Sequence, residues 1–207
     1  GNKTYLESRP SSLHVNLTNK CNLKCVMCHN ELAEIYDIDE RLVNFIKKNM
    51  PYLQYISWLD GEVFLSKIFQ ELSCLAAVHK VKQRITTNAL LLNEEKIRFI
   101  VNNNIDLKIS IDAAQKDLYE KIRIGGDFEK LIKNLEILKK YNEERSDEKY
   151  MYVMAATIMS CNYMTIKQMV KFAITHGFQA IDLQKCRTVH ETESIGLSAE
   201  QQNSVAV

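Results

Sequence analysis

Residues 83–111 read QRITTNALLLNEEKIRFIVNNNIDLKISI and contain a strand, a helix and a second strand in succession. The runs 83–87 and 107–111 have the length and the β-branched content typical of strands. Between them Asn93 precedes two glutamates, the pattern of a capped helix whose acidic first turn suits the helix dipole. Two strands joined by one helix predict a parallel pair, because a parallel connection needs a crossover.

The same alternation continues on both sides of this unit. The helix predicted after Asp39 stops at Pro51, and the last helix ends at Gly177, a residue suited to a left-handed cap. The other predicted strands are 13–17, 55–59, 150–159 and 180–184. Strands that alternate with helices predict an α/β fold with a parallel sheet, either open and doubly wound or a closed or partial barrel. In both architectures, the functional site lies at the carboxyl ends of the strands.

The composition is that of an ordinary globular chain. Of 207 residues, 46% are hydrophobic and 26% charged, which suits one domain. The net charge of +1 gives no reason to expect nucleic acid as a partner. No apolar run approaches the ~20 residues that span a bilayer, and residues 1–10 lack the apolar core of a signal peptide. We therefore expect a cytoplasmic protein without a membrane partner.

Three regions are expected along the chain. Residues 1–11 are predicted to be an N-terminal extension, and residues 12–186, which hold the strand and helix pattern, the core domain. The polar stretch 187–207 is expected to be either a C-terminal tail or the start of a further domain.

Three of the six cysteines lie within eight residues, directly after the first predicted strand. Cys21, Cys25 and Cys28 have the spacing C-x3-C-x2-C. Thiolates are soft ligands that suit iron–sulfur clusters and zinc. A loop with this spacing can wrap its sulfurs around one four-iron cubane and leave one iron open to a small molecule.

A helix is predicted to open at Ser66, with Ile68 and Leu72 at helical spacing, and Cys74 in it is expected to be buried packing. Cys161 and Cys186 stand at strand ends, where a structural role is expected and an auxiliary ligand or a reactive thiol is the alternative.

Four other interpretations of the cysteine cluster stay open. The thiols could form one face of a buried helix, although the neighbouring asparagines and lysines make a poor core helix. They could bind zinc together with His29. The pattern from Cys25 to His29 also matches a c-type haem attachment site, which normally requires export. The last alternative is a disulfide with one spare thiol.

Further polar segments stand where predicted strands end. They are Asp60-Gly61-Glu62-Val63, Thr87-Asn88-Ala89, Ser110-Ile111-Asp112, and the stretch 119–128, YEKIRIGGDF, which carries Arg123. Each alone also reads as an ordinary turn, because asparagine favours turns and Asp112 is equally suited to cap the next helix.

Together these motifs resemble the radical S-adenosylmethionine (radical SAM) superfamily over about residues 12–186. The resemblance is closest to the branch of peptide-modifying and sulfatase-maturing enzymes, many with a SPASM or twitch domain. It implies a partial (β/α)6 TIM-type barrel with parallel strands. It also implies a [4Fe–4S] cluster on Cys21, Cys25 and Cys28, with S-adenosylmethionine (SAM) bound at the open iron. Such an enzyme reductively cleaves SAM to a 5′-deoxyadenosyl radical, which abstracts a hydrogen atom from the substrate.

The resemblance also assigns the segment after the second strand. Asp60, Gly61 and Glu62 match the family segment that holds the methionine amino group of SAM through backbone and carboxylate. An ammonium group needs acceptors, and glycine lets backbone approach closely. Two positions depart from the family pattern: Asp60 replaces a glycine, and Val63 replaces a proline.

The remaining cofactor residues come from later motifs. By the resemblance, Asn88, Ser110 and Asp112 lie beside the ribose or methionine part of SAM. Arg123 reaches the methionine carboxylate, for which a fork of donors is suited. Met27 stands where the family usually has an aromatic residue near the adenine, and its adaptable side chain can substitute.

The partners follow from the same resemblance. A small reductant protein, flavodoxin or ferredoxin, would supply the electron. The substrate is a peptide, a protein or a small molecule, with peptide or protein modification favoured, and no catalytic acid or base can be named. The alternative function is a non-catalytic iron–sulfur or zinc-binding module that carries electrons or regulates.

Overall fold

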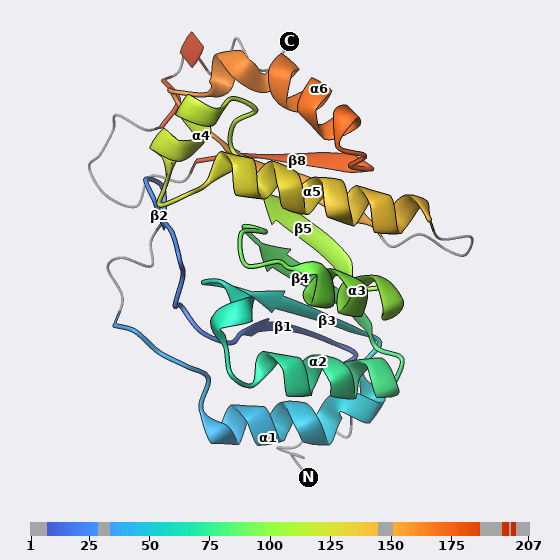
Figure 1. Cartoon of the computed structure of the whole chain (residues 1–207). Helices are drawn as coiled ribbons and strands as arrows, with labels where there is room; N and C mark the ends of the chain where they lie inside the picture. Colours follow the sequence, from blue (N-terminus) through green and yellow to red (C-terminus); the bar gives the residue numbers. More distant parts are fainter. Residues whose placement is uncertain (1–7, 29–33, 145–150, 187–195, 199, 202–207) are drawn as a thin grey trace.

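The computed structural model describes residues 8–28, 34–144, 151–186, 196–198 and 200–201 (Figure 1). Its centre is a six-stranded sheet in the order β1-β3-β4-β5-β7-β8, in which every neighbouring pair is parallel. The strands are β1 (Ser12–Asn16), β3 (Tyr55–Leu59), β4 (Lys82–Thr87), β5 (Asp106–Ser110), β7 (Tyr152–Ile158) and β8 (Ala180–Lys185). All six strands predicted from the sequence are present, with ends shifted by no more than two residues.

Helices connect successive strands of this sheet. They are α1 (Glu40–Asn49), α2 (Phe69–Val78), α3 (Glu94–Asn102), α4 (Lys116–Ile122), α5 (Phe128–Glu143) and α6 (Ile166–Thr175). Three begin at side-chain caps, in which Asp39, Asn93 and Asp127 accept hydrogen bonds from backbone N–H groups in the first turn. The predicted end of α6 at Gly177 is confirmed by a φ of +76°.

Three short 3-10 helices adjust the connections: η2 (Met50–Tyr52), η3 (Val63–Leu65) and η4 (Tyr163–Thr165). Pro51 lies in η2, immediately after α1, as expected for a residue that cannot continue a helix. The helix predicted to open at Ser66 begins three residues later, because η3 occupies the start of that connection.

The sheet has an apolar outer face and a polar inner face. Alternate side chains of a strand point to opposite faces. Helices α1, α2, α3, α5 and α6 cover the outer face (Figure 1). The outer face carries buried apolar side chains such as Ile56, Trp58, Ile85, Leu107 and Ile109. The inner face carries His14, Ser57, Arg84, Lys108 and Ser110. Barrels of this type usually fill their interior with branched apolar side chains. Here the inner face is polar and lines a cavity, which we call the lumen.

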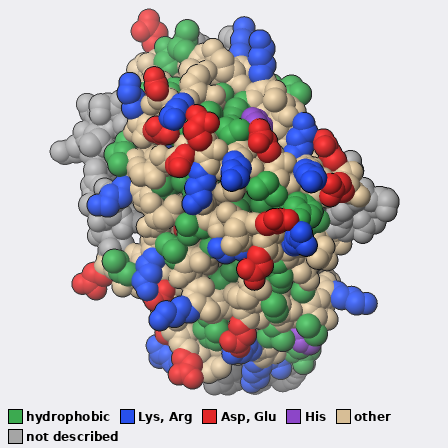
Figure 2. Space-filling view, viewed as in Figure 1, with side chains coloured by type: hydrophobic (Ala, Val, Ile, Leu, Met, Phe, Trp, Pro, Cys, Tyr) green, Lys and Arg blue, Asp and Glu red, His purple; other side chains and the backbone are tan. Residues whose placement is uncertain are grey.

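The predicted partial (β/α)6 barrel is confirmed. The sheet ends at β1 on one side and β8 on the other, so the barrel is not closed by strand pairing among the described residues. Lysine, arginine and acidic side chains are interspersed over the face shown in Figure 2, in keeping with the balanced charge. None of the helices in the described ranges has both the length and the hydropathy needed to cross a membrane.

A two-residue ladder, not expected from the sequence, joins distant segments beside the sheet. Strand β2 (Lys24–Cys25) pairs antiparallel with β6 (Arg123–Ile124), and Cys25 lies opposite Arg123. Val26 extends the pairing, because its N–H donates to the carbonyl oxygen of Ile122 at 2.9 Å. This ladder holds the cysteine segment against the end of α4.

Candidate cofactor and metal site

The three cysteines of the motif line one cavity of about 190 Å³. The cavity lies at the carboxyl ends of the strands, where function was expected in a parallel α/β fold. Besides Cys21, Cys25 and Cys28, its wall is formed by Leu23, Met27, Gly61, Thr86, Thr87, Asn88, Ser110 and Arg123. The structure therefore brings the cysteine motif and polar residues from β4 and β5 to one place.

Cys25 has the most enclosed thiol of the three. Burial, opposed by the positive charge of Arg123, raises its pKa to about 11. Burial also raises the pKa of Cys21. Metals bind the thiolate form, so loading of this site must release protons. The N–H of Cys28 donates to the carbonyl oxygen of Cys25 at 2.9 Å and forms the turn that brings the third thiol back to the cavity.

The donor set suits an iron–sulfur cluster. The three thiols line one cavity, and thiolates are the ligands that hold such clusters in proteins. Among the described residues, no group of three histidine, cysteine or acidic side chains is placed to hold a single metal ion.

The structure also bears on the other interpretations of the cysteine motif. The buried-helix interpretation is wrong, because the segment contains β2 and no helix. All six cysteines are free thiols. His29, which the zinc and haem interpretations need, lies outside the described residues. Outside the motif, Cys74 and Cys161 are exposed and Cys186 is buried, so a packing role is met only by Cys186.

Glu62 is fully buried behind the cavity wall. Its Oε1 accepts a hydrogen bond from the Thr87 hydroxyl at 2.8 Å, and its Oε2 accepts from the N–H of Asn88 at 2.9 Å. Burial raises the pKa of this carboxyl group, against these hydrogen bonds. Glu62 does not line the cavity. It holds the end of β4, and so positions the cavity residues Thr87 and Asn88.

Position 61 requires glycine because the backbone of residues 18–20 packs closely against it. Its φ is +49°, and a Cβ at this position would lie 2.5 Å from the carbonyl oxygen of Thr18 and closer still to that of Lys20. The next N–H, of Glu62, donates to Lys20 O at 2.7 Å. The turn after β3 therefore packs directly against the backbone that leads into the cysteine segment. Asp60 (φ +67°) accepts a hydrogen bond from the Tyr36 hydroxyl at 2.6 Å and lies outside the cavity wall.

Asn88 connects the end of β4 to the cysteine segment. Its amide nitrogen donates to Asn22 Oδ1 at 2.9 Å and lies 3.8 Å from Cys21 Sγ. Its side-chain oxygen accepts from the N–H of Leu90 at 2.9 Å, which fixes the amide orientation. A polar side chain held in this way can support a sulfur ligand and still face the cavity.

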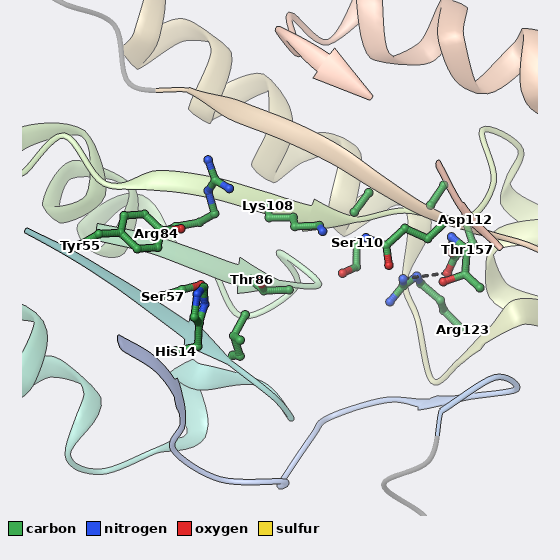
Figure 3. A pocket seen from close by; sticks show the side chains of 14 residues that line it. His14, Tyr55, Ser57, Arg84, Thr86, Lys108, Ser110, Asp112, Arg123 and Thr157 are labelled. Carbon is green, nitrogen blue, oxygen red and sulfur yellow. Dashed lines mark hydrogen bonds and ion pairs between the residues drawn. The ribbon is translucent and has the colours of Figure 1, made fainter. Parts of the chain in front are cut away.

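Arg123 forms a buried ion pair with Asp112 (Figure 3). Their side chains are 8% and 0% exposed, and Arg123 Nη2 lies 2.7 Å from Asp112 Oδ2. Burial lowers the pKa of Arg123, but Asp112 together with Cys25 and Tyr119 more than offsets this, so the pKa is raised and the guanidinium stays charged. Its Nη1 lies 3.7 Å from Cys25 Sγ, and its buried Nε has no hydrogen-bond partner among the residues described.

Asp112 does not cap the next helix, one of the two roles expected for it. Residue Gln115 occupies the cap position of α4. Asp112 Oδ1 instead accepts a hydrogen bond from the N–H of Thr157 at 2.7 Å. The carboxylate thus joins β7 to Arg123 and holds the guanidinium at the edge of the cavity.

The predicted site residues divide into two groups. The first group lines the cavity with the cysteines: Met27, Gly61, Asn88, Ser110 and Arg123. Asp60, Glu62 and Asp112 stand outside that wall and hold members of the first group or their neighbours. Thr86 was missed, and Thr87, although part of the motif Thr87-Asn88-Ala89, was not assigned a place in the wall. The polarity of Thr86 on a buried strand was the available signal.

A second cavity, of about 390 Å³, lies on the inner face of the sheet (Figure 3). It shares Thr86, Ser110 and Arg123 with the first cavity. Its other lining residues are His14, Tyr55, Ser57, Leu59, Arg84, Lys108, Asp112, Ala155, Ala156, Thr157 and Gln184. The cysteine cavity and the barrel lumen are therefore neighbours with a common wall.

Comparison with known proteins agrees with this arrangement. The model of the radical SAM superfamily matches residues 15–155. A probable GTP 3′,8-cyclase of Methanosarcina mazei is 27% identical over 166 residues, 67% of this chain and 49% of the relative. The mycofactocin maturase MftC of Mycobacterium ulcerans is 28% identical over 134 residues, 62% of this chain and 36% of the relative. The chain thus spans about half the length, or less, of these curated relatives.

Solved structures share the fold. Native anSMEcpe with bound AdoMet superposes with a TM-score of 0.77 at 21% identity, covering 95% of this chain and 58% of that chain. Streptococcus suis SuiB bound to precursor peptide SuiA has a TM-score of 0.71 at 21% identity, covering 96% and 46%. At these identities the likeness shows the architecture alone.

Proposed function

The chain belongs to the radical SAM superfamily, and on that premise we propose that Cys21, Cys25 and Cys28 hold its [4Fe–4S] cluster beside a SAM site. Superfamily members bind both groups, and the curated relatives are enzymes. The observation that carries the assignment is the shared cavity, in which all three thiols face Asn88, Ser110 and Arg123. Three protein thiolates leave one corner of a four-iron cluster for SAM.

The bound cluster would supply one electron that cleaves SAM to methionine and a 5′-deoxyadenosyl radical, which takes a hydrogen atom from the substrate. The protein's own part is to bind and orient. Arg123 lines the cavity and offers a charged fork to the methionine carboxylate. Asp112 positions that fork. Ser110 and Asn88 offer polar groups at the wall, and Met27 offers an apolar surface to the adenine.

Asp60 and Glu62 contribute in a different way from Gly61, because neither lines the cavity. Gly61 faces the cavity through its backbone, so it can still accept from the methionine ammonium. Glu62 and Asp60 act as positioning residues, the first through Thr87 and Asn88, the second through Tyr36.

The proposal extends to partners. A small reductant protein, flavodoxin or ferredoxin, supplies the electron in a reducing, cytoplasmic setting. Peptide or protein modification remains the favoured outcome, supported by the likeness to a maturase and to the fold of SuiB. A SPASM or twitch-type continuation is part of the same proposal.

Anaerobic reconstitution with iron and sulfide tests this function. We expect about four irons per chain, a cluster spectrum that changes when SAM is added, and 5′-deoxyadenosine on reduction. Cys25→Ala should lose the cluster, whereas Cys74→Ala, which alters an exposed thiol on α2, should keep it. An unchanged iron content in Cys25→Ala would refute the assignment. One zinc and no iron would instead support a non-catalytic module.

A further inference from the structure

The lumen cavity lies where a molecule attacked from the cysteine side must sit. It has a volume of about 390 Å³ and shares Thr86, Ser110 and Arg123 with the cysteine cavity. Ligand pockets commonly have volumes of about 300–1,000 Å³, so this lumen admits a small molecule or a single side chain with its neighbours. The question is which chemistry its wall would accept.

The wall is basic. Two arginines and one lysine line it, Arg84, Arg123 and Lys108, against a single acidic residue, Asp112. Arg123 and Asp112 neutralise each other in their buried pair. Lys108 is paired with Asp182, which lies 2.6 Å away. Arg84 is therefore the cation of the lumen wall that remains without a close carboxylate partner in these pairs.

Arg84 is incompletely satisfied. Its nearest acid is Asp106, whose Oδ2 is 3.7 Å from Arg84 Nη2 and 3.4 Å from Lys82 Nζ, so one carboxylate serves two cations at long range. The Nε of Arg84 is buried without a hydrogen-bond partner among the described residues, as is the hydroxyl of Thr86 on the same strand. Both side chains line the lumen, and Figure 3 shows them on β4. These two atoms are closed to solvent, so a ligand in the lumen would meet the accessible part of the Arg84 side chain, which is 33% exposed and lines the cavity.

We propose that the substrate, seated in the lumen, carries an anionic group, a carboxylate or a phosphate, that binds to Arg84. A guanidinium presents paired donors to either anion, and enclosure by the sheet strengthens the attraction. Thr86 and the Tyr55 and Ser57 hydroxyls on β3 complete a polar wall. Anchoring at Arg84 leaves the rest of the substrate toward Ser110 and Arg123, the wall shared with the cysteine cavity. The naming of this site as substrate site rests on the proposed function.

Titration calorimetry with the reconstituted full chain tests the proposal. The probes are glutarate for a carboxylate and inorganic pyrophosphate for a phosphate, each at low ionic strength. We expect one equivalent of at least one probe to bind, and Arg84→Gln to weaken that binding at least tenfold. A preference for glutarate assigns a carboxylate substrate, and a preference for pyrophosphate assigns a phosphate ester.

Lys82→Gln is the matched control. Lys82 stands two residues before Arg84 on β4 and contacts the same Asp106, but its side chain is 63% exposed and does not line the lumen. Lys82→Gln removes the same charge as Arg84→Gln but outside the lumen, so we expect it to change anion affinity less than twofold. Equal losses of affinity in Arg84→Gln and Lys82→Gln would overturn the proposal. So would the absence of binding by either probe up to 20 mM, roughly the weakest affinity that a specific site of this size would show.

Two precautions keep the result decisive. If Arg84→Gln fails to fold by circular dichroism, Arg84→Lys keeps the charge and removes the fork; weaker binding by several fold supports the site, and unchanged binding refutes it. The titration uses neither SAM nor reductant. A protein that binds the anion but produces no 5′-deoxyadenosine therefore refutes the proposed function alone, and the reverse result refutes the anion site alone.

Discussion

Cys25 and Arg123 are 98 residues apart in the chain and lie directly opposite each other in the β2–β6 ladder, with Nη1 of the arginine 3.7 Å from the sulfur. The ladder thus places a buried cation beside the thiol with the most strongly raised pKa of the motif. The same guanidinium pairs with Asp112 through its other terminal nitrogen. One side chain connects the cysteine segment, the β6 strand and the end of β5.

Removal of Arg123 should destabilise the fold strongly. Arg123→Ala leaves the Asp112 carboxylate buried and unpaired, and loss of one partner of such a pair costs about 3–5 kcal/mol. The double variant Asp112→Asn, Arg123→Met should lose less than the sum of its single variants, because no charge is left buried. The free energy of unfolding in urea measures both. Strictly additive losses would show that the pair contributes no coupling.

Gly61 and Gly125 both have positive φ and should differ sharply on substitution. Gly61→Ala places a Cβ against two carbonyl oxygens, whereas the Cβ of Gly125→Ala would meet nothing closer than 3.5 Å. Backbone strain alone costs about 1–3 kcal/mol in each variant, and overpacking adds about 1–3 kcal/mol to the first. Thermal or urea unfolding of the two variants checks this order. Equal losses would contradict the close packing of residues 60–62 on the cysteine segment.

Asn88 should affect retention of the cluster more than the fold. Asn88→Ala removes the hydrogen bond to Asn22 and the amide beside Cys21, and loss of such outer partners weakens metal sites roughly tenfold or more. The rate of iron release to a chelator is the measurement. Asn102→Ala, which changes an exposed residue at the end of α3, is the control. Equal release rates in the two variants would count against the role of Asn88.

His176 should make stability depend on pH. Burial lowers the pKa of this imidazole; Glu136 has a smaller effect that raises the pKa, and Lys139 lowers it further. Its folded-state pKa is below the unfolded value of about 6.5, so its contribution is present above that pH and is lost as the pH falls through the folded value. His176→Gln should therefore show a smaller drop in urea midpoint between pH 8 and pH 5 than the unmodified chain. An identical drop would show that other groups dominate.

Local patterns were enough to predict the sheet, because each strand and each capped helix depends on neighbours in the chain. Asp39 and Asn93 cap the helices that the sequence indicated. The β2–β6 ladder could not be predicted, since two residues show no periodicity and their partners are far away in sequence. Nor could the sequence tell that Glu62 faces Thr87 and Asn88 instead of the cavity. The exposed position of Cys74 shows the same limit, because helical spacing with Ile68 and Leu72 did not bury it.

The antiparallel β2–β6 pairing also bears on how the protein is made. A ribosome adds about 5–20 residues per second, so Arg123 emerges roughly 5–20 seconds after Cys25. During that interval the nascent chain carries the three thiols without the wall that later encloses them. Assembly of the metal centre, and protection of these sulfurs from oxidation, therefore belong to a late stage of biosynthesis.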